Sequence, residues 1–276
     1  MIQLLQEIFS YGFLVQAILV GSLVALCAAL LGVSLVLKRY SMIGDGLSHV
    51  GFGALSIAMA MNVAPLAVAI PVVVAAAFLL LRLSQNGKLR GDSAIALISS
   101  GALAAGVLVT SLSSGLNADV YGYMFGSILS MGEGDVILSL ILALVVLVMF
   151  ILFYNNIFAI TFDESFARAT GTRANLYSMI IALLTALTIV IGMRIMGTML
   201  ISGLIIFPAL TAMRLCSSFR GVVLCAAAVS VACFLLGMIL SYAIATPAGA
   251  SIVMVNVAAY CLFWAIGKLR AHPHAG

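Results

Sequence analysis

Asp45 and His49 are the residues whose types and spacing most clearly permit chemistry, and they lie in the run 43–51, IGDGLSHVG. If this run is helical, the four-residue spacing puts the carboxylate and the imidazole one turn apart on the same face. Both groups can then bind one ion, and together they suit Zn(II), Mn(II) or Fe(II). The Asp45/His49 pair therefore predicts a site for a divalent transition metal ion.

One helix supplies only two of the ligands that such an ion needs. A two-fold homodimer would bring two copies of the Asp45/His49 pair to one axis and complete a four-ligand site. Oxygen and nitrogen ligands with no thiolate beside them also suit an ion that has to be released again. The alternative is structural: a helix starts near the cytoplasmic surface, Asp45 caps it, and His49 hydrogen-bonds to a neighbour.

The composition places this pair in a membrane. Of the 276 residues, 65% are hydrophobic and 7% are charged, and the mean hydropathy is +1.31, which leaves too little polar surface for a soluble globule. Apolar runs of about 20 residues recur, as helical spans require, whereas a membrane barrel would show short alternating segments. Ionisable residues inside such spans normally face a cavity and mark a solute path. The functional interpretation of the pair is therefore favoured.

The chain is predicted to be an all-α polytopic membrane protein, a single transmembrane domain over 1–276 with about eight or nine transmembrane helices. The glycine-rich stretch 113–135 suits a re-entrant or interfacial piece better than a full crossing. The N-terminal residues lack the positive region of a cleavable signal, so the first apolar run is kept as a span. The expected spans are 13–37, the Asp45/His49 segment to 61, 65–82, 94–111, 136–154, 176–191, 196–213, 222–245 and 251–266.

Charge placement predicts the orientation. With 161–173 in the cytoplasm, every Lys and Arg except Arg194 falls on the cytoplasmic side, as the positive-inside rule requires. The N-terminus is then outside and the C-terminus cytoplasmic. We expect Arg194 to snorkel at the outer end of its span, with Glu133 and Asp135 solvated at the outer surface and Asp119 near the pore mouth.

The polar block 161–173 predicts a short cytoplasmic helix at about 162–171. Thr161 and Glu164 stand at the spacing of a capping box, and Gly171 provides a C-terminal stop. Exposed Phe162 and Phe166 would suit docking into a groove of another protein, and the alternative is a loop lying at the membrane interface. Because the sequence has no phosphate-binding loop, nucleotide hydrolysis by the chain in that manner is excluded, and energy must come from a gradient or a partner.

Other functions receive no support from the sequence. The five cysteines are scattered and odd in number, so we expect free thiols and neither a disulfide framework nor a zinc cluster. The formal charge of +4 reflects orientation in the membrane and does not indicate nucleic acid. No catalytic constellation is recognisable, so an enzyme ranks last.

Four stretches resemble one family in order along the chain. The run 38–49, KRYSMIGDGLSH, resembles the Gly-Asp-x-x-x-His signature of the ABC-3 family, the membrane permeases of bacterial zinc, manganese and iron ABC importers. Gly46, where many relatives carry alanine or threonine, is a small departure from that signature. The other matching stretches are 123–129 (YMFGSIL), 197–209 (GTMLISGLIIFPA) and 163–171 (DESFARATG), the last being similar to the family's cytoplasmic coupling segment.

The resemblance implies a homodimeric permease in the bacterial cytoplasmic (inner) membrane, with two cytoplasmic ATP-binding subunits that hydrolyse ATP and an extracytoplasmic metal-binding protein. It also implies that Asp45 and His49 line the pore. The rival hypothesis is an ion-coupled secondary transporter of a small cation acting alone. The metal itself is not identified by these ligands. Coupling to the ATPase is implied for the residues Asp163, Glu164, Phe166, Ala167, Arg168 and Gly171.

Overall fold

The computed structural model describes residues 12–85, 91–113, 122, 124–126, 132–198 and 200–271. Over these ranges the chain is helical without strands, as predicted. The helices are α2 (Gly12–Leu37), α3 (Ile43–Ala60), α4 (Pro65–Gln85), α5 (Gly91–Leu112), α7 (Glu133–Leu152), α8 (Tyr154–Phe162), α9 (Glu164–Ala169), α10 (Ala174–Met196), α11 (Ile201–Leu215), α12 (Phe219–Ile244) and α13 (Ala248–Ala271).

Seven helices of the described chain are long and apolar enough to cross a membrane: α2, α4, α5, α7, α10, α12 and α13. The other two predicted spans correspond to α3, an 18-residue helix that carries the Asp45/His49 pair, and to α11, which has only 15 residues. The multi-span helical class is therefore confirmed, whereas the count of eight or nine crossings stays a prediction.

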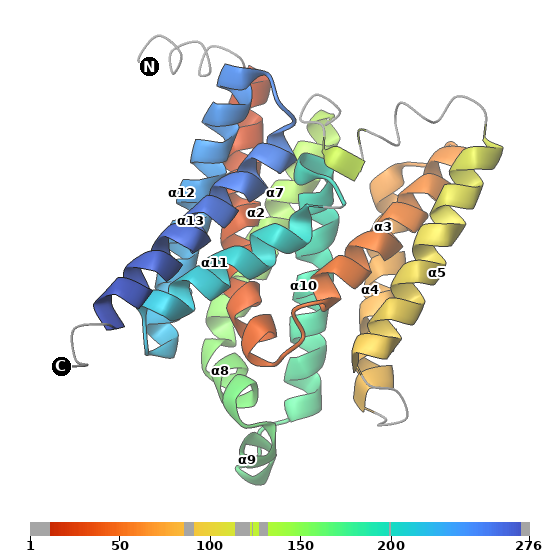
Figure 1. Ribbon diagram of the computed structural model, residues 1–276. Helices are drawn as coiled ribbons and strands as arrows, with labels where there is room; N and C mark the ends of the chain where they lie inside the picture. The colour runs from red at the N-terminus through yellow and green to blue at the C-terminus, as the bar shows by residue number, and fades with distance from the viewer. Residues whose placement is uncertain are drawn as a thin grey trace.

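Helices α2 and α10 form the centre of the molecule. Buried residues make up 72% of the most apolar window of α2 and 83% of that of α10, so other parts of the protein cover most of the circumference of both helices. Helix α2 packs against α7, α10, α11 and α12, while α10 also contacts α3 and α4. Figure 1 shows α3, α4 and α5 grouped on one side, α11, α12 and α13 on the other, and α9 projecting at the end opposite the N-terminus.

Small residues set the close packing of α3. An added Cβ at Gly53 would lie 2.6 Å from the carbonyl oxygen of Ala102, a backbone atom of α5. Glycine at this point lets the two helix backbones approach, and dispersion contacts then hold them together without any hydrophobic drive from lipid. Helix α3 is thereby fixed in rotation, which in turn fixes the direction of the Asp45/His49 pair.

Arg194 corrects one expectation. It is 4% exposed and forms an ion pair with Asp135, in the first turn of α7. The prediction that Arg194 snorkels to the surface was wrong, and so was the prediction that Asp135 is simply solvated. A carboxylate on a neighbouring helix satisfies the guanidinium within the protein, which removes the need to reach the interface.

Some predicted segments lie outside the described residues. These are most of the stretch 113–135, including Asp119, and the tail beyond 271. Helix α13 continues three residues past Lys268, further than the predicted span. The chain also forms α8 directly after α7, where the predicted span ends at 154 and no further helix was expected before 162.

Candidate metal site and coupling helix

Asp45 and His49 lie side by side in the first two turns of α3. The Nε2 atom of His49 is 3.6 Å from Oδ2 of Asp45. The His49 side chain is 15% exposed and the Asp45 side chain is 38% exposed. The hydroxyl of Ser48, between them in sequence, donates to the Asp45 carbonyl oxygen at 2.7 Å and stays within its own helix. The expected one-turn spacing on a single face is therefore present.

Neighbouring helices close the flanks of α3 beside this pair. On one flank an added Cβ at Gly46 would lie 2.6 Å from Cγ2 of Ile95 in α5, and on the other an added Cβ at Gly51 would lie 2.6 Å from Sδ of Met193 in α10. Gly46, the departure from the family signature, thus faces α5. The Asp45/His49 pair occupies the part-exposed strip between the two packed flanks.

The separation of the pair suits chelation of one ion. Ligand atoms about 2.1 Å from a transition metal ion lie about 3.5 Å apart when their angle at the ion is near tetrahedral, close to the observed 3.6 Å. The other ring nitrogen of His49, Nδ1, is buried and has no hydrogen-bond partner among the described residues. The described residues include no group of three or more His, Cys, Asp or Glu side chains suited to a metal, so Asp45 and His49 are a pair of potential ligands without a third.

The predicted cytoplasmic helix is present as α9, but its cap differs. The Asp163 side chain accepts a hydrogen bond from the Phe166 amide at 2.9 Å and so caps α9. Thr161 was expected in that role, yet it lies within α8 and its hydroxyl donates to the Ile157 carbonyl. The capping-box prediction was wrong because either side chain could cap, and only the backbone path selects one. Gly171 adopts φ 88° just after the helix, in agreement with its predicted stop.

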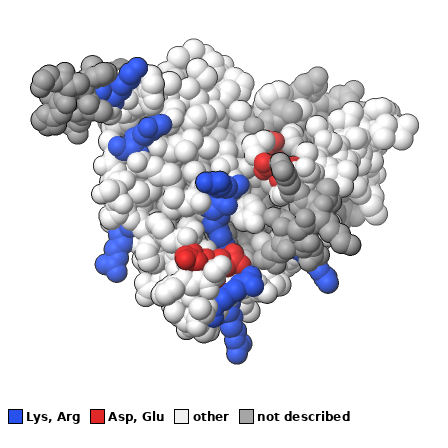
Figure 2. Space-filling model, turned by 60° about the horizontal axis from the view of Figure 1, so that its bottom comes forward, with Lys and Arg blue, Asp and Glu red and all other residues white. Residues whose placement is uncertain are grey.

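The side chains of α9 divide into an exposed and an inward set. Phe166 is 66% exposed, and Arg168 bonds Glu164 and Asn175 at 2.6 and 2.7 Å while remaining accessible. Ala167 is buried against the rest of the chain, so it supports the helix from within. Figure 2 shows this end of the molecule, where acidic side chains lie directly beside basic ones.

Phe162 differs from Phe166, although both were expected to serve docking. It is 61% exposed, yet its ring contacts Phe158 and Phe219, with centroids 5.0 and 5.8 Å apart. This aromatic cluster ties the end of α8 to α12. Phe166 is thus the large apolar side chain that α9 itself presents to solvent.

Lys38 is a residue of this region for which the sequence predicted no contact with the short helix. It follows α2 directly, and its Nζ lies 3.5 Å from Oε2 of Glu164 in α9. The two residues are far apart in sequence, so no spacing rule connects them. Their contact joins the turn before the candidate metal site to the candidate coupling helix.

The structure thus shows a multi-span helical protein with a closely spaced Asp45/His49 pair on α3 and a short polar helix, α9, at one end. Residues 10–267 match the ABC 3 transport family. The chain belongs to that family, and the assignment made from the sequence is confirmed.

Named relatives and a solved structure agree with this assignment. The chain is 26% identical over 254 residues to the manganese import system permease protein ScaB of Streptococcus gordonii, covering 92% of this chain and 91% of the relative. It is 28% identical over 252 residues to the high-affinity zinc uptake system membrane protein ZnuB of Haemophilus influenzae, covering 91% and 97%. The structure of PsaBC from Streptococcus pneumoniae in complex with Fab matches with a TM-score of 0.85 at 24% identity, covering 96% of this chain and 95% of that one, which supports the fold.

Proposed function

We propose that the chain is the membrane permease subunit of an ATP-binding-cassette importer that moves a divalent transition metal ion, zinc, manganese or iron, into the cytoplasm. The observation that carries this proposal is the Asp45/His49 pair, whose facing ligand atoms lie 3.6 Å apart on one helix of an ABC 3 transport family member. The names of two relatives, a manganese import permease and a zinc uptake membrane protein, support the cargo class.

The working unit is a homodimer. Each chain contributes two ligands, so two chains related by a two-fold axis supply four, the usual number for zinc in a protein. The part-exposed strip of α3 that carries the pair is the surface that must face the axis. An extracytoplasmic metal-binding protein delivers the ion to this site.

The end of the molecule with α9 is cytoplasmic, with the N-terminus outside and the C-terminus inside. Support comes from the helix ends around α9: Lys38 and Arg39 follow α2, and Arg173 precedes α10, which is the enrichment expected of cytoplasmic loops. Helices α3 and α11 complete the bundle as the eighth and ninth membrane helices.

Two cytoplasmic ABC ATPase subunits dock on the α9 helices and hydrolyse ATP, so the permease itself is not an enzyme. The apolar side chain of Phe166 suits insertion into a groove on the ATPase surface. Closure of the ATPase pair then rocks the two permeases and exposes the metal site alternately to each side.

Reconstitution of the complete complex in vesicles tests the proposal against the rival secondary transporter. An importer copurifies with an ATPase subunit and takes up radiolabelled Zn(II) or Mn(II) only with ATP and its binding protein. Uptake driven by an ion gradient, without nucleotide or partner, would contradict it. Competition among the three metals then identifies the cargo.

A further inference from the structure

An ion pair connects the turn before α3 with α9. Lys38 Nζ lies 3.5 Å from Glu164 Oε2 and also donates to the Ser178 hydroxyl at 3.2 Å. The Lys38 side chain is only 11% exposed, and that of Glu164 is 34% exposed. Three elements, the end of α2, the coupling helix α9 and α10, thus meet at one ammonium group.

The pKa values of both members of the pair are lowered, for different reasons. Burial lowers the pKa of Lys38, and the Glu164 charge opposes that shift. Burial alone would raise the pKa of Glu164, but the hydrogen bond from Arg168 and the charges of Lys38 and Arg168 outweigh it and hold the pKa below its ordinary value. Half-buried ion pairs contribute little to stability, and their best-attested use is to fix the register of the groups they join.

Lys38 is connected to the metal-binding helix by a short, hydrogen-bonded turn. The amide of Tyr40 donates to Leu35 at 2.8 Å, and the amide of Ile43 donates to Tyr40 at 3.0 Å. Helix α3 begins at Ile43, two residues before Asp45. A displacement of Lys38 would therefore also move the first turn of α3, the helix that holds the candidate ligands.

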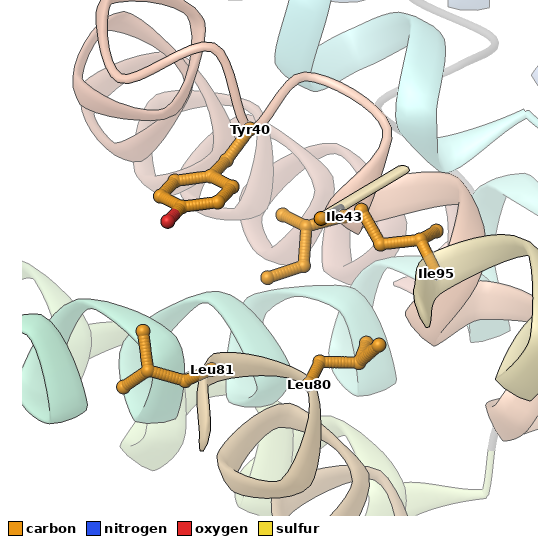
Figure 3. A pocket seen from close by; sticks show the side chains of 6 residues that line it. Tyr40, Ile43, Leu80, Leu81 and Ile95 are labelled. Atoms are coloured by element: carbon orange, nitrogen blue, oxygen red, sulfur yellow. The ribbon is translucent and has the colours of Figure 1, made fainter. Parts of the chain in front are cut away.

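The packing beneath this turn leaves room for such a displacement. Two small cavities, each of about 20 Å³, lie under it and share Tyr40, Ile43 and Leu81 in their walls. Figure 3 shows one of them, with Tyr40 and Ile43 on one side and the α4 residues Leu80 and Leu81 on the other. Close-packed interiors switch between discrete arrangements, and voids are where a side chain can take a second position.

We infer that the Lys38–Glu164 ion pair transmits the movement of α9 to α3, so that ATPase docking at one end positions the Asp45/His49 pair at the other. The inference rests on the proposed function. Lys38 and Glu164 are positioning residues in it, because neither touches the metal.

Neutral variants of the complete transporter test the inference. The permease variants Lys38→Met and Glu164→Gln are reconstituted with their ATPase and binding protein, and metal uptake and ATP hydrolysis are measured together. We expect each variant to import about tenfold less metal per ATP hydrolysed, while ATPase copurification and hydrolysis persist. The double variant is expected to lose less than the two single losses combined, because both substitutions remove the Lys38–Glu164 contact.

Two further variants separate a coupling role from a structural one. Lys38→Arg keeps a cation within reach of Glu164 and is expected to retain coupling. Arg39→Met removes a positive charge from the same turn but leaves the ion pair, so its metal-to-ATP ratio should stay at the wild-type value.

Three results would overturn the inference. Wild-type coupling in both Lys38→Met and Glu164→Gln would do so, as would equal loss in Arg39→Met, or fully additive loss in the double variant. If Lys38→Met fails to assemble, Glu164→Gln and Lys38→Arg still decide the matter. Failure of the proposed function is distinguishable, since the wild-type complex would then show no ATP-dependent metal uptake.

Discussion

In the proposed metal site, Asp45 and His49 each contribute one ligand atom, so neither can replace the other. Removing the carboxylate or the imidazole leaves a single ligand per chain, and a lone ligand binds a transition metal weakly. The neighbouring Ser48 is bonded within its own helix and offers nothing to the ion. Substitution of Ser48 is therefore a suitable control for substitution of Asp45 or His49 on the same stretch of α3.

We expect Asp45→Ala and His49→Ala to lower metal uptake by about 100-fold without preventing assembly of the complex. Ser48→Ala should leave uptake within about threefold of wild type, because it loses only a helix-internal hydrogen bond. Uptake of radiolabelled Zn(II) and Mn(II) in vesicles containing equal amounts of each complex measures the difference. Normal uptake by either ligand variant would remove the pair from the pathway.

Glu164 gives a pH-dependent prediction. Its pKa is held below the ordinary value in the folded protein, so its contribution to stability is complete above the pKa of the unfolded chain and is lost as the pH falls through the depressed folded value. The difference in thermal stability between wild type and Glu164→Gln should therefore be largest at about pH 7 and shrink as the pH falls through the depressed folded pKa. Melting curves of the purified protein from about pH 7 into the acid range measure it, and a difference that grows in acid would contradict the assignment.

At the scale of the element, α9 is stabilised by contacts with the rest of the protein. A six-residue helix is too short to form alone. It is stabilised by the Asp163 cap, by the buried Ala167 and by the Lys38–Glu164 contact. The exposed Phe166 adds nothing to this internal support, which leaves it available to a partner.

Phe166→Asp should weaken ATPase association by about tenfold or more, because it puts a charge where an apolar groove is expected. Phe166→Leu keeps an apolar side chain and should retain most of the binding. Titration of purified permease with the ATPase subunit gives both affinities, and the melting temperature of the permease should change little in either variant. Unchanged affinity of the aspartate variant would place the docking surface elsewhere.

Contacts within one element were predictable from the sequence, whereas contacts between elements were not. Contacts within one helix follow from spacing, so the juxtaposition of Asp45 and His49 was predictable. The pairs Arg194–Asp135 and Lys38–Glu164 join different helices, and no period in the sequence connects their members.

Hydropathy located the long apolar helices well, and the span predicted over 136–154 ends close to the end of α7, but nothing in the pattern showed that a further helix, α8, begins there. The choice of Asp163 over Thr161 as the α9 cap likewise depends on the path of the backbone. Sequence alone thus predicted the class and the candidate ligands, and the cross-links between elements required the fold.

At the scale of the whole molecule, the proposed site predicts how many metal ions bind per permease. If two chains share one ion at their axis, the complex binds one transition metal ion per two permeases, and each chain's pair is half of the site. Co-expression of wild-type and His49→Ala chains with different tags, followed by sequential purification, isolates the mixed dimer.

With three ligands remaining, the mixed dimer should bind and transport at a level between the wild-type and doubly substituted dimers, while its ATPase docking stays intact. Independent sites, one per chain, would instead give two ions per dimer and half of the wild-type uptake in the mixed species. Metal analysis of the purified wild-type dimers separates the two arrangements, because a shared site binds one ion per dimer and independent sites bind two. A shared ion also requires that the strips of α3 carrying Asp45 and His49 face each other across the axis.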